Sequence, residues 1–164
     1  MIEFKRVLFP TDMSDASLKI VPFVKTMANR FDAEIHLLYV ARSVDYLSAL
    51  QLEAPTLFSF NTELLDKSTV SLAQFKEKHF GNKKNNKSAV VLGYPSEEIL
   101  NYVSKEKIDL IIMGTHGRRG LEKVFFGSVA EQVVKSSPVP VLVINPHRIE
   151  QMPIDPSISG EGVS

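Results

Sequence analysis

No cysteine occurs among the 164 residues, so disulfide bonds, thiol catalysis and cysteine-ligated metals are excluded. Histidine is scarce, and its four positions fit neither the H-x3-H nor the HExxH spacing of zinc sites. No apolar run approaches the ~20 residues that a membrane-spanning helix needs. Net charge is also lacking, because nineteen basic and nineteen acidic residues cancel. The sequence as a whole therefore has no electrostatic attraction for nucleic acid or for an anionic membrane.

The remaining composition is that of an ordinary soluble domain. Hydrophobic residues make up 44% and charged residues 23%, and the length suits one domain with a substantial core. The sequence opens with charged residues such as Glu3 and Lys5 rather than with a secretion signal, so a cytoplasmic location is expected. Residues 147–164 are rich in proline, serine and glycine and lack periodicity. We therefore expect one domain over residues 1–146 and a flexible tail over 147–164.

Short apolar segments alternate with longer segments in which apolar residues recur every three or four positions. This alternation is typical of βαβ units. The expected strands are Arg6–Phe9, Glu34–Val40, Ser88–Leu92, Leu110–Met113 and Val141–Ile144. The fourth of these is apolar at every position, as in a sheet that helices cover on both faces. The sequence therefore predicts an α/β fold: an open, doubly wound, Rossmann-like sheet of five parallel strands.

Expected helix starts are marked by residues that favour a first turn. Ser14, Thr62 and Pro95 precede or open the first three helical segments. The fourth begins at Ser128, where Ser128-x-x-Glu131 has the form of a capping box.

Two features disturb this regular pattern. Pro22 lies inside the first helical segment, where we expect a kink. Residues 41–61 form a long connection between the second strand and the second helix, and such connections often serve function. Because Tyr46, Phe58 and Phe60 make this connection too apolar for a solvated linker, we expect a short helix that packs on the domain, on a partner subunit or over a ligand.

The segment from Gly114 to Ser128 carries the strongest functional signal. It follows the fourth expected strand and leads into a helical segment, and its four glycines allow the backbone to approach another molecule closely. A helix that begins there directs unpaired N–H groups and the positive end of its dipole at the same space. Arg118 and Arg119 add positive charge. The segment therefore predicts a site for an anionic, phosphate-bearing ligand.

The spacing of the segment is G-x2-G-x9-G-[S/T], with Gly114, Gly117, Gly127 and Ser128 at the fixed positions. This pattern resembles the nucleotide-binding signature of the universal stress protein family. The resemblance covers residues 3–146. It extends to the first strand and its Pro-x-Asp turn (6–14), the second strand (36–40) and the turn after the third (93–95). It implies a single domain with strand order 3-2-1-4-5 and a ligand site between the first and fourth strands.

The resemblance and the chemistry of the side chains assign roles within this site. The Asp12 carboxylate suits a ribose hydroxyl, an adenine amino group or a water bound to Mg²⁺, with no direct metal ligand expected. Val40 and Met113 would flank the base, and the N–H groups of Ser128 and Val129 would hold phosphates. The expected binding residues are Pro10, Thr11, Asp12, Val40, Met113, Gly114, Thr115, His116, Gly117, Arg118, Arg119, Gly127, Ser128 and Val129.

Several of these residues also have a purely structural interpretation. Asp12 can cap the first helix in place of Ser14, and Ser128 can act only as an N-cap. Arg118 and Arg119 either clamp phosphates or solvate the loop. His116 is interpreted as a bystander, because no nucleophile accompanies it.

Together these patterns predict an adenine-nucleotide-binding regulator of a stress response, loaded with ATP, ADP or AMP, with or without Mg²⁺. P-loop and GxGxxG motifs are missing, so binding with at most slow ATP hydrolysis or autophosphorylation is the leading interpretation. The alternatives are a dimeric interaction protein that holds no nucleotide, and a weak ATP hydrolase or transferase. The resemblance also implies a homodimer that pairs through the apolar edge strand Val141–Ile144, with protein clients still to be identified.

Overall fold

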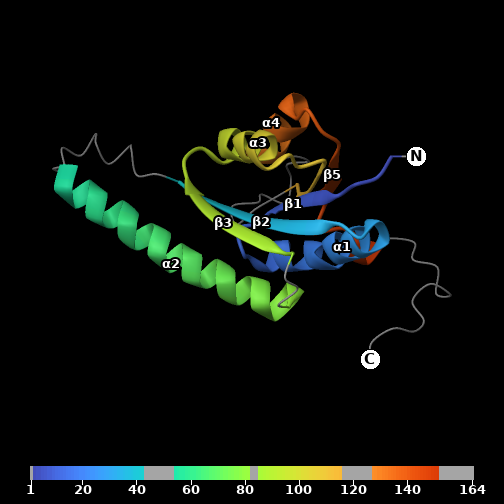
Figure 1. Cartoon of the computed structure of the whole chain (residues 1–164), viewed down its shortest axis with the longest axis horizontal. Coiled ribbons are helices and arrows are strands. Elements are labelled where there is room, and N and C mark those ends of the chain that lie inside the picture. Colours follow the sequence, from blue (N-terminus) through green and yellow to red (C-terminus); the bar gives the residue numbers. More distant parts are fainter. Residues whose placement is uncertain (1, 43–53, 82–84, 116–126, 152–164) are drawn as a thin grey trace.

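The computed structural model describes residues 2–42, 54–81, 85–115 and 127–151. One parallel sheet in the order β3-β2-β1-β4-β5 forms its centre (Figure 1). The strands are β1 (Arg6–Pro10), β2 (Glu34–Ala41), β3 (Lys87–Leu92), β4 (Leu110–Gly114) and β5 (Val141–Ile144). The helices are α1 (Asp15–Phe31), α2 (Ala54–Phe80), α3 (Pro95–Glu106) and α4 (Ser128–Ser136). The predicted fold class and strand order are confirmed, and each strand boundary lies within one residue of its expected position.

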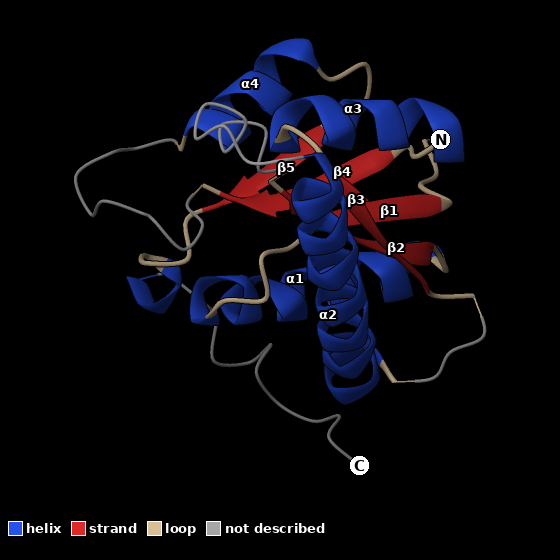
Figure 2. Cartoon of the chain, turned by 90° about the vertical axis from the view of Figure 1, so that its left-hand side faces the viewer, coloured by secondary structure: helices blue, strands red, loops and turns tan. Residues whose placement is uncertain are grey.

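The sheet separates two layers of helices, α1 with α2 on one face and α3 with α4 on the other (Figure 2). Alternate residues of each strand point to opposite faces. In β1, Phe9 packs in a cluster with Val24 of α1 and Leu72 of α2, whereas Leu8 packs in a cluster with Val133 of α4. Burying each such side chain contributes about 1.5–3 kcal/mol. Both faces of the central strands are therefore core, which explains their uninterrupted apolar sequence.

The prediction that the second helix begins just after Thr62 is wrong, because α2 already begins at Ala54. Pro55 lies in the first turn, where its missing N–H has no intrahelical partner to lose. Thr62 is inside the helix, and its hydroxyl donates to the Phe58 carbonyl at 2.9 Å. Phe58 and Phe60 are 76% and 47% exposed, so they are not buried against the described part of the domain, which was one of the three places expected. None of the helices in the described ranges is long and apolar enough to cross a membrane.

The helix caps confirm one prediction and correct another. Ser14 is the N-cap of α1, and its side chain accepts a hydrogen bond from the Ser17 N–H. The predicted capping box of α4 is wrong, because the N-cap is Gly127 and Ser128 is already the first helical residue. Glu131 is therefore not placed to reach back to a serine N-cap, and it pairs with Lys135 instead at 2.6 Å.

Two further expectations concern Pro22 and the tail. α1 runs through Pro22 without interruption, and this residue is exposed, so the missing hydrogen bond lies on the solvent side. The expected kink itself stays a prediction. Of the expected tail, Ile149–Gln151 form a 3-10 helix, and Ile149 packs against the core cluster that contains α1. Residues 152–164 lie outside the described residues, so the flexibility expected there stays a prediction.

Candidate functional site

The carboxyl ends of β1 and β4 lie side by side where the strand order of the sheet reverses. The two strands pair directly, Val7 with Leu110 and Leu8 with Ile111. The helices that follow these two strands in the sequence lie on opposite faces of the sheet, α1 after β1 and α4 after β4 (Figure 1). In open parallel sheets, ligands bind beyond the strand ends at such a reversal. The structure thus brings together the segments 10–12 and 114–115 that the sequence predicted to share a site.

Side-chain hydrogen bonds hold the turn that follows β1. Thr11 is buried, its N–H donates to the Leu38 carbonyl at 2.9 Å, and its Oγ1 accepts from the Met13 N–H at 3.0 Å. Met13 has a φ of 58°, in the left-handed region. A non-glycine residue pays about 1–3 kcal/mol for such a conformation, which persists only where its surroundings enforce it. The turn is therefore a constrained element.

The Asp12 carboxylate is directed at the start of α1. Its Oδ1 atom accepts hydrogen bonds from the Ser14 N–H at 3.0 Å, the Ser14 hydroxyl at 2.5 Å and the Ser17 hydroxyl at 2.6 Å. Asp12 does not replace Ser14 as the N-cap, so that structural alternative is wrong. Three donors on one oxygen fix the orientation of the carboxylate. Ser17 is a residue of this site that the sequence analysis missed.

The end of β4 is joined to the start of α4 through Thr115. The Thr115 N–H donates to the Ile144 carbonyl at 2.9 Å, and the Gly127 N–H donates to the Thr115 carbonyl at 2.7 Å. The second bond places the first turn of α4 beside the end of β4. Gly127 has no side chain that could cap the helix, and the N–H groups of Ser128 and Val129 have no acceptor within it. These groups and the helix dipole therefore favour an anion at this edge.

The other predicted site residues differ in their surroundings. The Met113 side chain is only 5% exposed and belongs to the core cluster of α3 and α4, against which Val40 and Val129 pack. Pro10, Asp12 and Gly114 are half-buried, and Ser128 is exposed. His116, Gly117, Arg118 and Arg119 lie outside the described residues.

Two complementary groups therefore lie at the carboxyl ends of the neighbouring strands β1 and β4. The α4 start offers donors to an anion such as phosphate, and Asp12 offers an acceptor to a hydroxyl or amino group. In the described part of the chain, no three acidic or histidine side chains are grouped so that they could hold a metal ion. The geometry of this edge suits a ligand that carries both an anionic group and a hydrogen-bond donor.

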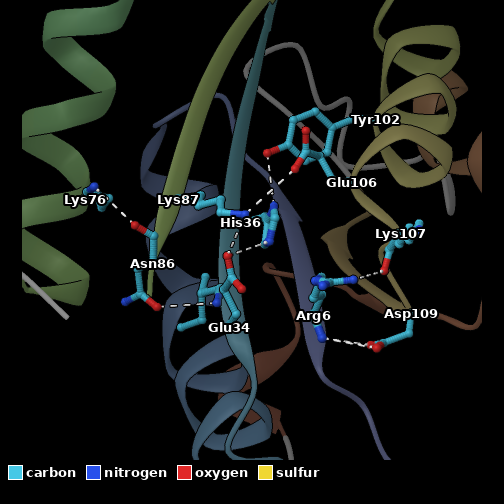
Figure 3. Close-up of polar contacts among 11 residues, drawn as sticks. Arg6, Glu34, His36, Lys76, Asn86, Lys87, Tyr102, Glu106, Lys107 and Asp109 are labelled. Atoms are coloured by element: carbon cyan, nitrogen blue, oxygen red, sulfur yellow. Dashed lines mark hydrogen bonds and ion pairs between the residues drawn. The ribbon is translucent and has the colours of Figure 1, made fainter. Parts of the chain in front are cut away.

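A second polar cluster, not predicted from the sequence, lies toward the amino ends of β2 and β3 (Figure 3). His36 is fully buried, with its Nδ1 3.0 Å from the Tyr102 hydroxyl and its Nε2 3.2 Å from Glu34 Oε1. The Nζ atom of Lys87 lies 3.1 Å from the same Glu34 oxygen. The Nε2–Glu34 contact is close but lacks hydrogen-bond geometry. Burial raises the pKa of Tyr102 to about 12, which keeps its hydroxyl protonated.

Lowering the pH below about 6.5 should destabilise the fold through His36. Burial lowers the pKa of His36, against an opposing effect of Glu34. The unfolded state therefore binds more protons than the folded state between the folded pKa and about 6.5, and the free energy of unfolding falls as the pH drops through that window. Urea denaturation at pH 7.5 and 5.5 measures this loss. The decrease in the free energy of unfolding between pH 7.5 and 5.5 should be smaller in His36→Gln than in the wild type. An equal decrease in both proteins would contradict the assignment of this effect to His36.

The class of the protein follows from this architecture: it is a Rossmann-like α/β protein whose candidate site lies at the reversal of strand order. Residues 3–145 match the family model described as the universal stress protein family. The chain belongs to the universal stress protein family.

Individual relatives agree with this assignment. Universal stress protein MJ0531 of Methanocaldococcus jannaschii is 37% identical over 144 residues, which cover 86% of this chain and 82% of that protein. Universal stress protein MJ0577 of the same organism is 33% identical over 158 residues, covering 87% and 96%. A solved structure of MJ0577 superposes with a TM-score of 0.75 at 29% identity, covering 88% of this chain and 97% of that one. A universal stress protein solved in complex with cAMP shares the fold, with a TM-score of 0.56 at 20% identity and coverage of 88% and 99%.

Proposed function

We propose that the edge formed by the carboxyl ends of β1 and β4 binds an adenine nucleotide, ATP, ADP or AMP, and that the loaded protein regulates a stress response. The observation that carries the proposal is the position of the α4 start. The hydrogen bond from Gly127 to Thr115 holds its donors beside β4, next to the strand end that carries Asp12. One helix start whose first N–H groups have no acceptor within the helix, and one carboxylate, match a phosphate and a nucleoside at the two ends of one ligand.

The family supports a nucleotide as the class of ligand. One relative with the same fold has been solved in complex with cAMP, which joins adenine, ribose and phosphate. In this chain, the N–H groups of Ser128 and Val129 would hold phosphate, while Val40 and Met113 would flank the base. Where Mg²⁺ accompanies the nucleotide, Asp12 would contact it through water. The proposed activity is binding without efficient turnover.

Nucleotide extraction tests the proposal most directly. Freshly purified protein is denatured, and the supernatant is chromatographed for adenine nucleotides. We expect a stoichiometric adenine nucleotide, or micromolar binding of ATP to protein that has been stripped and dialysed against Mg²⁺. Protein that neither carries nor rebinds a nucleotide would favour an interaction protein in which this edge has no ligand.

Asp12→Ala should weaken ATP binding about 10-fold while leaving the binding of inorganic triphosphate nearly unchanged. The removed carboxylate is proposed to accept from the nucleoside, and hydrogen bonds to charged groups contribute about 1.5 kcal/mol or more, or about a factor of ten. Calorimetric titration with both ligands measures the two affinities. Equal losses for ATP and triphosphate would contradict the assigned role of Asp12.

We further propose that the protein forms a homodimer through β5. This strand is at the edge of the sheet, and its Leu142 side chain is 36% exposed. An exposed apolar edge strand favours pairing with a second copy. Pro140 lacks a donor, so pairing should run through Val141–Ile144.

Leu142→Lys should convert this dimer into a monomer without unfolding it. The substitution places a charge on the pairing edge, a common feature of edge strands that do not associate. Light scattering behind size-exclusion chromatography measures the mass. Val134→Lys is the matched control, because Val134 is 44% exposed on α4 rather than on the edge strand. A monomeric wild type, or dissociation in both variants, would contradict pairing through β5.

A further inference from the structure

Ser17 is bonded to Asp12 through both its donor and its acceptor functions. Its hydroxyl donates to Asp12 Oδ1 at 2.6 Å, and its Oγ accepts from the Asp12 N–H at 3.4 Å. Ser17 lies in the first turn of α1, where its own N–H donates to the Ser14 hydroxyl at 3.3 Å. A single side chain thus connects a helix that packs in the core with the carboxylate at the candidate site.

We propose that Ser17 is a positioning residue, which fixes the Asp12 carboxylate in the orientation that receives the nucleoside. The inference rests on the proposed nucleotide binding and assigns a role that the family pattern used above does not include. A carboxylate on a turn can rotate about its side-chain bonds, and ordering it during binding would lower affinity. Ser14 also bonds to Oδ1, but it caps α1, so replacing it would change helix stability as well.

The expected role follows from where these contacts act. Sites are most exact when binding side chains are held by neighbours on rigid elements, and α1 is anchored by buried residues such as Val24. Asp12, in contrast, sits beside Met13, whose left-handed backbone needs support from its surroundings. Ser17 therefore acts on the nucleoside end of the ligand and not on the phosphate end, which α4 is proposed to hold.

A double-mutant cycle between Ser17 and Asp12 tests the proposal. Ser17→Ala should lower ATP affinity about 3- to 10-fold, the range of one hydrogen bond, and should leave inorganic triphosphate affinity unchanged. Ser17→Thr should restore ATP affinity because it restores the hydroxyl. In the Asp12→Ala background, Ser17→Ala should have no further effect on ATP, because the group that it positions is gone.

Ser104→Ala is the matched control. Its hydroxyl donates within α3 to the Leu100 carbonyl at 3.2 Å, so it reports the cost of a helical serine-to-alanine change elsewhere. Thermal unfolding of every variant confirms that it is folded. If Ser17→Ala lowers ATP affinity equally with and without Asp12, or lowers triphosphate affinity as much, the positioning role is overturned although the site binds nucleotide. A wild type that binds neither ligand overturns the proposed function itself.

Discussion

Gly127→Val should lower adenine-nucleotide affinity about 100-fold while the domain stays folded. Gly127 is the N-cap of α4, beside the end of β4, where the ligand phosphates are proposed to lie. Forcing a branched side chain into space that another group fills costs about 3 kcal/mol at the upper end, which corresponds to about 100-fold in affinity. The backbone tolerates valine there, because φ is −69° and ψ is 153°, both in the extended region.

Calorimetric titration of ATP and thermal unfolding together measure this prediction. Ser136→Val is the matched control, because it adds the same side chain to an exposed position at the other end of α4. The ATP affinity of Ser136→Val should equal that of the wild type. Unchanged ATP affinity in Gly127→Val would show that the ligand does not approach the α4 start. Valine is also a poorer N-cap than glycine, so a small decrease in stability is expected and does not bear on the result.

Asp109→Ala should lower the free energy of unfolding by about 2–3 kcal/mol. Asp109 precedes β4, and its carboxylate accepts from the Lys5 N–H at 2.8 Å. It also accepts from the Arg6 N–H at 3.1 and 3.2 Å (Figure 3). It thereby ties the start of β1 to the start of β4, the pair of strands that carries the candidate site at its other end. Hydrogen bonds to a charged acceptor contribute about 1.5–3 kcal/mol, and alanine leaves the part-buried Arg6 N–H without this partner.

Urea denaturation of the wild type, Asp109→Ala and Asp109→Asn measures the effect. Asparagine keeps one acceptor oxygen without the charge, so its loss should lie between those of the other two proteins. Nucleotide affinity of folded Asp109→Ala should be unchanged. Asp109 lies at the amino end of β4, whereas Asp12 lies beyond the carboxyl end of the neighbouring strand β1. Equal stability of all three proteins would mean that the hydrogen bonds from Lys5 and Arg6 to the Asp109 carboxylate do not stabilise the fold.

The strands and their order could be predicted because burial imposes a simple pattern on them. Leu110–Met113 is apolar throughout since both of its faces are core. The start of α2 could not be predicted in the same way. Phe58 and Phe60 are exposed, so the first turns of the helix bury no face that periodicity would reveal. Periodicity in the sequence indicates a helix only where the helix packs, and the buried positions described in α2 all come after Thr62, so the pattern predicts too late a start.

The candidate site was predictable to the extent that it depends on topology. Adjacent strand ends place Asp12 and Gly114 together in any sheet of this order. Ser17 could not be assigned, because its contact depends on the left-handed turn at Met13, which a methionine does not signal. His36 was equally hidden, since its partner Tyr102 is 66 positions away and a single histidine in a strand looks like any other core residue.

The charged and polar contacts near the amino ends of the strands, among them Asp109 with Arg6 and His36 with Tyr102, bear on how this protein can change over evolution. Active sites commonly trade stability for function, because the same residues serve both. Here Asp109 ties the amino ends of β1 and β4 together, at the other end of these strands from the residues proposed to receive a ligand. Substitutions near the amino ends of the strands can therefore raise or lower the stability of the fold without changing ligand affinity. Substitutions at the carboxyl ends can change ligand affinity while these contacts stay intact.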